Sequence, residues 1–81
     1  MATQNEIKAA LEAAGASHHE FEVTYLKGVR DELWSGYYAA FVLGRLPDLD
    51  ITPSQLALLL EQADGDDWAA AAAGLVVAAV E

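Results

Sequence analysis

Thr52-Pro53-Ser54-Gln55 is the stretch that decides the fold of this 81-residue chain, because it has the form of a helix-starting capping box. In a capping box the threonine hydroxyl accepts a hydrogen bond from the first helical turn. The glutamine side chain three residues later accepts one from the threonine N–H. Two other stretches have this form, and an aspartate forms a fourth start: Thr3-Gln4-Asn5-Glu6, Ser17-His18-His19-Glu20, and Asp66 before Trp68. Four helix starts in a short chain predict an all-α fold.

Glycine and proline provide the stops between these starts, at Gly15, Pro47 and Gly65. We therefore expect helices over 4–14, 18–27, 29–46, 53–63 and 67–80, with a break at Gly28. Without that break, a helix over 18–46 would be about 43 Å long, too long for its neighbours to cover. The sequence predicts one domain over 1–81, a compact four- or five-helix fold packed around the central apolar helix 29–46.

Residues 20–25 are ambiguous, because polar and apolar side chains alternate there as they do in a strand. Phe21 and Tyr25 are also four residues apart, which suits one face of a helix. No other segment alternates, so a strand here would have no partner within the chain. We predict a helix, with a local or intermolecular β pair as the alternative.

The predicted helix 29–46 is apolar on most sides, which indicates that it is buried on most sides. Its four aromatic residues fall within eight positions: Trp34, Tyr37, Tyr38 and Phe41. One helical stripe cannot bury so many rings, so Trp34 or Tyr38 is expected to reach the surface with its polar tip. These two are candidate interface residues, and ordinary core packing is the alternative.

Acidic residues gather in one segment, since 47–67 holds six of them and no Lys or Arg, in a chain of net charge −9. The candidate interface acids are Asp48, Asp50, Asp64 and Asp66. Direct nucleic-acid binding is not expected, because the four basic residues are scattered rather than clustered. The acidic segment suits a partner protein with a basic surface, although solubility would explain it as well. Another alternative is an inhibitor whose acidic face mimics nucleic acid.

The composition favours a cytoplasmic protein with no membrane partner. There is no cysteine, which excludes disulfides and thiolate metal sites, and the N-terminus lacks a basic-then-apolar signal region. The longest apolar run, 68–80, is shorter than the roughly 20 residues that span a bilayer.

One group of residues resembles a metal site. His18, His19 and Glu22 lie within about one helical turn, and Asp31 and Glu32 follow the break at Gly28. Zinc requires about four ligands, so these five would have to converge. We expect no cofactor and two packed or solvated histidines. A metal-binding domain or metal-dependent enzyme centred on His18, His19 and Glu22 is the alternative.

The last predicted helix carries small residues spaced by four: Ala70, Gly74 and Ala78. Such a stripe lets another helix approach closely, at the cost of about 1 kcal/mol for the mid-helix glycine. The approaching helix belongs either to the same chain or to a second copy, so Gly74 is a candidate interface residue.

The stretch His18–Leu46 contains His-His-x-Phe-Glu, Gly-Val-Arg-Asp-Glu-x-Trp and Tyr-Tyr-Ala-Ala-Phe-Val-Leu-Gly-Arg-Leu, and it resembles small uncharacterised bacterial helical proteins. This resemblance covers about a third of the chain and implies a bacterial origin but no catalytic residue. Neither a nucleophile elbow nor a phosphate-binding loop is present, so no catalytic residue is predicted. The sequence thus favours a small acidic interaction or regulatory protein acting through protein–protein contacts, with a homodimer as one expected arrangement.

Overall fold

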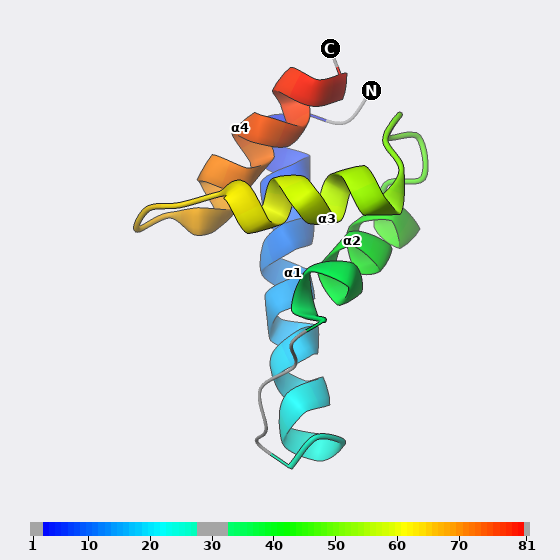
Figure 1. Cartoon of the computed structure of the whole chain (residues 1–81), viewed down its shortest axis with the longest axis vertical. Coiled ribbons are helices and arrows are strands. Elements are labelled where there is room, and N and C mark those ends of the chain that lie inside the picture. The colour runs from blue at the N-terminus through cyan, green and yellow to red at the C-terminus, as the bar shows by residue number, and fades with distance from the viewer. Residues whose placement is uncertain (1–2, 28–32, 81) are drawn as a thin grey trace.

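The computed structural model describes residues 3–27 and 33–80, and within these ranges every regular element is a helix. The four helices are α1 (Gln4–Thr24), α2 (Trp34–Arg45), α3 (Pro53–Gln62) and α4 (Trp68–Val80) (Figure 1). The all-α prediction is confirmed. The alternating segment 20–25 is helical as far as Thr24, so the helical interpretation of that segment was right.

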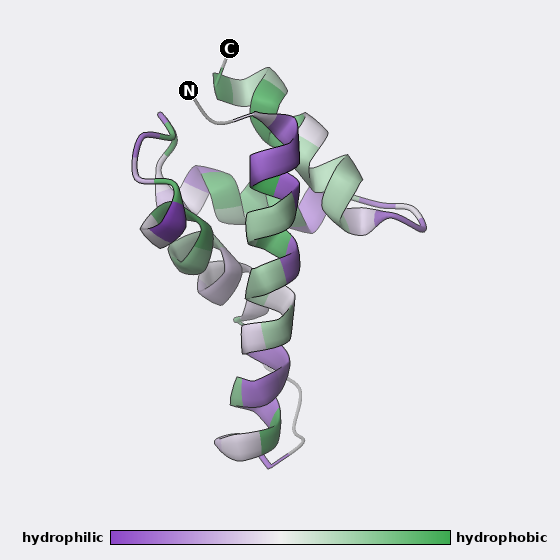
Figure 2. Ribbon diagram, turned by 180° about the vertical axis from the view of Figure 1, so that it is seen from behind, coloured by the Kyte–Doolittle hydropathy of each residue, from purple (hydrophilic) through white to green (hydrophobic). Residues whose placement is uncertain are grey.

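The helices pack in neighbouring pairs, with α1 against α2 and α4, and α3 against the same two helices. In the view of Figure 1, α3 passes in front of α1, and the C-terminal half of α1 extends beyond α3 and α4. Seen from behind and coloured by hydropathy, α1 has hydrophilic residues both in its first turns and in the projecting half (Figure 2). On this half, the rings of His18 and Phe21 pack against Tyr37 of α2.

All four helices contribute to the core. Its buried members are Ile7, Ala10, Leu11, Ala39, Val42, Leu49, Leu56, Leu60, Ala72, Ala73 and Val76. In α1 the buried positions 7, 10, 11 and 14 follow the helical spacing expected of an amphipathic helix. Burying such apolar area contributes about 25 cal/mol per Å², which makes this cluster the main source of stability.

The capping boxes at Thr3 and Thr52 are confirmed. The Thr3 hydroxyl accepts the Glu6 N–H at 3.1 Å, and the Glu6 carboxylate accepts the Thr3 N–H at 2.9 Å. The Thr52 hydroxyl accepts the Gln55 N–H, and the Gln55 side chain accepts the Thr52 N–H, both at 3.1 Å. Both boxes close within four consecutive residues, which is why a local pattern predicts them.

The predicted stop at Gly15 and start at Ser17 are wrong, because α1 continues through both residues. Ser17 does not cap a helix; its Oγ lies 2.6 Å from the hydroxyl oxygen of Tyr37 on α2. Gly15 also faces α2, since a Cβ placed there would lie 3.2 Å from the Tyr38 hydroxyl. Contacts with α2 therefore override the local stop and start signals.

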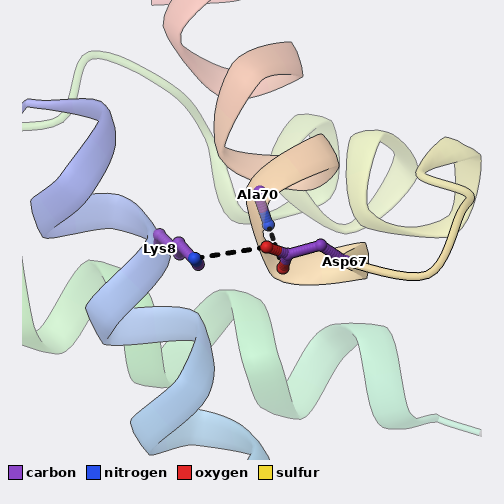
Figure 3. A network of polar contacts seen from close by, with 3 residues as sticks. All are labelled: Lys8, Asp67 and Ala70. Carbon is purple, nitrogen blue, oxygen red and sulfur yellow. Dashed lines mark hydrogen bonds and ion pairs between the residues drawn. The ribbon is translucent and has the colours of Figure 1, made fainter.

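The start of α4 is shifted by one residue from the prediction, because Asp67 rather than Asp66 forms the cap. The Asp67 carboxylate accepts the Ala70 N–H at 3.2 Å, and its other oxygen pairs with the Lys8 ammonium at 3.2 Å (Figure 3). α3 ends at Gln62, three residues before the predicted stop at Gly65, and Gly65 in the following loop has a φ of +107°, a conformation that favours glycine.

The connection between α1 and α2 begins earlier than predicted. The helix ends at Thr24, and Lys27 has a φ of +54°, in the left-handed region. The predicted break at Gly28 lies outside the described residues, as do positions 29–32 of the predicted central helix. Within the described part, that helix begins at Trp34 and ends at Arg45, two residues before the predicted stop at Pro47.

Candidate functional site

His18 is buried between α1 and α2, with 8% of its side chain exposed. Its Nδ1 lies 3.6 Å from a carboxylate oxygen of Glu22, one turn later on α1. The Tyr37 ring stands edge-on to the imidazole at 4.9 Å between centroids, and the Tyr38 ring lies at 5.3 Å. The imidazole thus has a carboxylate on one side and aromatic rings around it, which is a well-packed polar environment.

The structure brings together two of the five predicted metal ligands, His18 and Glu22. His19 is exposed, and Asp31 and Glu32 lie outside the described residues. Within 3–27 and 33–80, no three His, Asp or Glu side chains are grouped closely enough to hold a metal ion. Two ligands from one helical turn fall short of the roughly four that zinc requires.

The two aromatic interface candidates, Trp34 and Tyr38, are half-buried and pack against Trp68 at the start of α4. Ring centroids are 5.5 to 5.8 Å apart in this trio, and two of its three pairs meet at 89°. The Trp68 indole N–H also donates to the Leu60 carbonyl at 3.2 Å. Burial raises the pKa of the Tyr38 hydroxyl, and the nearby Glu22 charge raises it further. These rings connect α2, α3 and α4 inside the chain.

An open hollow of about 390 Å³ lies on the outer side of α3. It is lined by Asp50, Ile51, Gln55, Leu58, Leu59, Gln62 and Ala79, and we call it the α3 groove. Its four α3 residues occupy positions i, i+3, i+4 and i+7, so they form one stripe along the helix. The last turn of α4 provides the opposite wall through Ala79.

The groove arises from the leucine spacing of α3. Leu56 and Leu60 turn fully into the core, which leaves Leu58 on the outer side with 60% of its surface exposed. Leu59 is half-buried, so it both packs against the core and lines the groove. The sequence does not predict this hollow, and its one local signal is Leu58, which is out of phase with the buried leucines of α3. A large exposed apolar side chain in a hollow is a feature that binding surfaces share.

The four acidic interface candidates are exposed and lie at the two ends of α3. Asp48 and Asp50 precede the helix, and Asp50 lines the groove, whereas Asp64 and Asp66 follow the helix. The ten residues of α3 separate these pairs by about 15 Å along the helix axis. In the part of the chain that the structure describes, Asp48 and Asp50 make no hydrogen bond or ion pair, so both charges face solvent.

Gly74 packs within the chain. A Cβ built on Gly74 would lie 3.6 Å from the Gln4 side-chain nitrogen on α1, which is ordinary contact. Farther along the predicted stripe, Ala78 is exposed. The buried face of α4 is instead formed by Ala72, Ala73 and Val76. Part of the small-residue stripe therefore serves the approach of α1 to α4.

No protein-family model, curated protein or solved structure matches this chain. Within residues 3–27 and 33–80, no helix is both long enough and apolar enough to cross a membrane.

Proposed function

We propose that this chain is a small acidic interaction protein, which acts in the cytoplasm by binding a partner protein with a basic surface at the α3 groove. The observation that carries the proposal is that the acidic Asp50 and the exposed Leu58 line the same hollow. An apolar contact that excludes water supplies affinity, and an acidic rim supplies orientation and faster encounter with a cationic partner.

The charge distribution supports a heterologous partner over a second copy. The segment 47–67 contains six acidic and no basic residues, so two α3 grooves placed face to face would bring like charges together. With a net charge of −9, the chain also attracts basic surfaces at a distance, and salt would screen this attraction. A basic partner is favoured over a homodimer at this surface.

A nucleic-acid mimic would require its acidic side chains to form a continuous exposed row. Here Asp48 and Asp50 are separated from Asp64 and Asp66 by the length of α3, about 15 Å. Between them the outer stripe carries glutamines and leucines. This arrangement favours an amphipathic protein segment over the phosphate-binding site of a nucleic-acid protein.

The proposal is tested by titrating the isotope-labelled protein with two amphipathic peptides of about 18 residues, one of Lys and Leu and one of Glu and Leu. The Lys–Leu peptide should shift the amide resonances of Asp50, Leu58 and Ala79, and raising the salt from about 50 to about 300 mM should weaken its binding. The Glu–Leu peptide should not bind.

Asp50→Asn should weaken binding of the Lys–Leu peptide, because it removes the charge at the groove. The matched control is Glu12→Gln, which removes one charge from an exposed residue of α1 and should leave binding unchanged. Equal effects of the two substitutions, or resonance shifts spread over the whole surface, would reduce the interaction to general charge attraction and overturn the proposal.

A second candidate function, metal binding, is favoured by the 3.6 Å approach of His18 to Glu22. One tightly held zinc, iron or manganese ion per chain, lost in Glu22→Ala, would support it. Metal analysis of the purified protein that finds no stoichiometric ion, with no thermal shift on metal addition, would count against it.

A further inference from the structure

We infer that the α3 groove accepts its partner as an amphipathic helix, which lies along α3 and places an aliphatic side chain on Leu58 and Leu59. The inference rests on the proposed function and specifies the kind of segment that binds. It follows from the shape of the groove wall, from the type of backbone around it and from the position of its charge.

The groove wall matches a helix in spacing. Gln55, Leu58, Leu59 and Gln62 form a stripe from the first to the last of these residues, a rise of about 10.5 Å or two helical turns. A partner helix presents its own stripe with the same repeat, so apolar side chains at i, i+4 and i+7 meet this wall over its full length. An extended segment rises about 3.3 Å per residue and would match the wall at fewer positions.

The backbone around the groove also disfavours an extended partner. Extended peptides bind by adding a strand to an open sheet edge, where unpaired N–H and C=O groups accept them. Residues 3–27 and 33–80 contain no strand, so the described part of the chain offers no such edge. The wall is built from the sides of α3 and α4, and binding there depends on side-chain packing.

The rim of the groove specifies where the partner carries its charge. Asp50 lies before the first turn of α3, whereas Leu58 lies five residues after Pro53, about 7.5 Å along the axis. A Lys or Arg that pairs with Asp50 should therefore lie between one and two turns from the aliphatic anchor. Gln62 offers a neutral polar side chain at the opposite end of the stripe.

The test uses two peptides of identical Leu, Lys and Ala composition and about 18 residues. In the first, the leucines recur at helical spacing, and in the second they alternate with lysine. The helical peptide should bind the full chain at least about five-fold more tightly, and its helix content by circular dichroism should rise on binding. Equal affinity of the two peptides would overturn this inference and leave the proposed function standing.

Leu58→Ala identifies the anchor. Because Leu58 is 60% exposed, its truncation should leave the fold intact, while binding of the helical peptide should weaken by about five-fold or more. The matched control is Val23→Ala, which truncates an apolar side chain of α1 that is 55% exposed, and it should leave binding unchanged. Binding that survives Leu58→Ala but is lost in Asp50→Asn would refute the role of Leu58 as the anchor of the partner helix and would leave the proposed function standing. Failure of both cationic peptides to bind would overturn the proposed function itself.

Discussion

The hydrogen bond between Ser17 and Tyr37 gives a sharp test of how α1 and α2 are joined. Their hydroxyl oxygens lie 2.6 Å apart in a partly buried position. A typical hydrogen bond contributes a net 0.5–1.5 kcal/mol, so Tyr37→Phe should lower the free energy of unfolding by roughly that amount. Ser17→Ala loses the same bond but gains about 0.5 kcal/mol of helix propensity, which leaves a net loss of roughly 0–1 kcal/mol.

The double variant separates this account from a capping role for Ser17. Once Tyr37 is Phe, Ser17→Ala has no interhelical bond left to break, so it should be neutral or slightly stabilising. The coupling energy of the cycle should therefore be about 0.5–1.5 kcal/mol. A capping serine would instead show the same loss of about 0.5–2 kcal/mol in both backgrounds, with no coupling.

Urea denaturation followed by circular dichroism measures all four proteins, and equal m-values would show that the extent of unfolding is unchanged. Ser17→Gly adds an independent readout. Within a continuous helix glycine should cost about 1–2 kcal/mol, because propensity and the hydrogen bond are both lost. At a cap it would cost only a few tenths of a kcal/mol relative to serine. A small effect of Ser17→Gly together with zero coupling would refute the continuous α1.

Three further substitutions test packing and charge. Gly15→Val should destabilise the protein by about 1–3 kcal/mol in urea melts, because its side chain would overpack the Tyr38 ring, and a stable variant would contradict this contact. The pKa of Asp67 is lowered mainly by the hydrogen bond from the Ala70 N–H and next by Lys8. The negative charge of Asp67 therefore stabilises the fold above the ordinary pKa of 3.8. The stability difference between the wild type and Asp67→Asn should therefore shrink as the pH falls from about 7 to about 3, and a constant difference would argue against it. Gly74→Leu should leave the molecular mass by light scattering unchanged, whereas conversion of a dimer to a monomer would show that Gly74 packs on a second copy.

The helix boundaries that could be predicted are those whose hydrogen bonds close locally. Thr3 and Thr52 each meet a partner three residues away, so four letters of sequence contain the whole interaction. Ser17 has the same pattern, but its hydroxyl finds Tyr37, twenty residues farther along the chain. Which of Asp66 and Asp67 caps α4 depends on the backbone geometry, and a sequence with two adjacent aspartates does not reveal that geometry.

The candidate site was only partly predictable, for the same reason. Asp50 was identified from charge, but the hollow beside it exists because the last turn of α4, with its small Ala79, lies next to the outer stripe of α3. Likewise, the surplus rings of α2 suggested an exposed Trp34 or Tyr38. Both are half-buried and pack against Trp68 of α4, and nothing local in the sequence pairs them with that residue.

The acidic residues around α3 differ in what they do for the fold, and this difference bears on function. Asp67 caps α4, Asp64 accepts the N–H of Gly65, and Glu61 accepts the hydroxyl of the buried Ser35 at 2.8 Å. The Asp50 side chain makes no such hydrogen bond in the described part of the chain. Solubility requires net charge but does not require that charge to border a hollow with an exposed leucine. Asp50 and the exposed Leu58 line the same hollow, and the proposed partner is one that contacts both side chains at once.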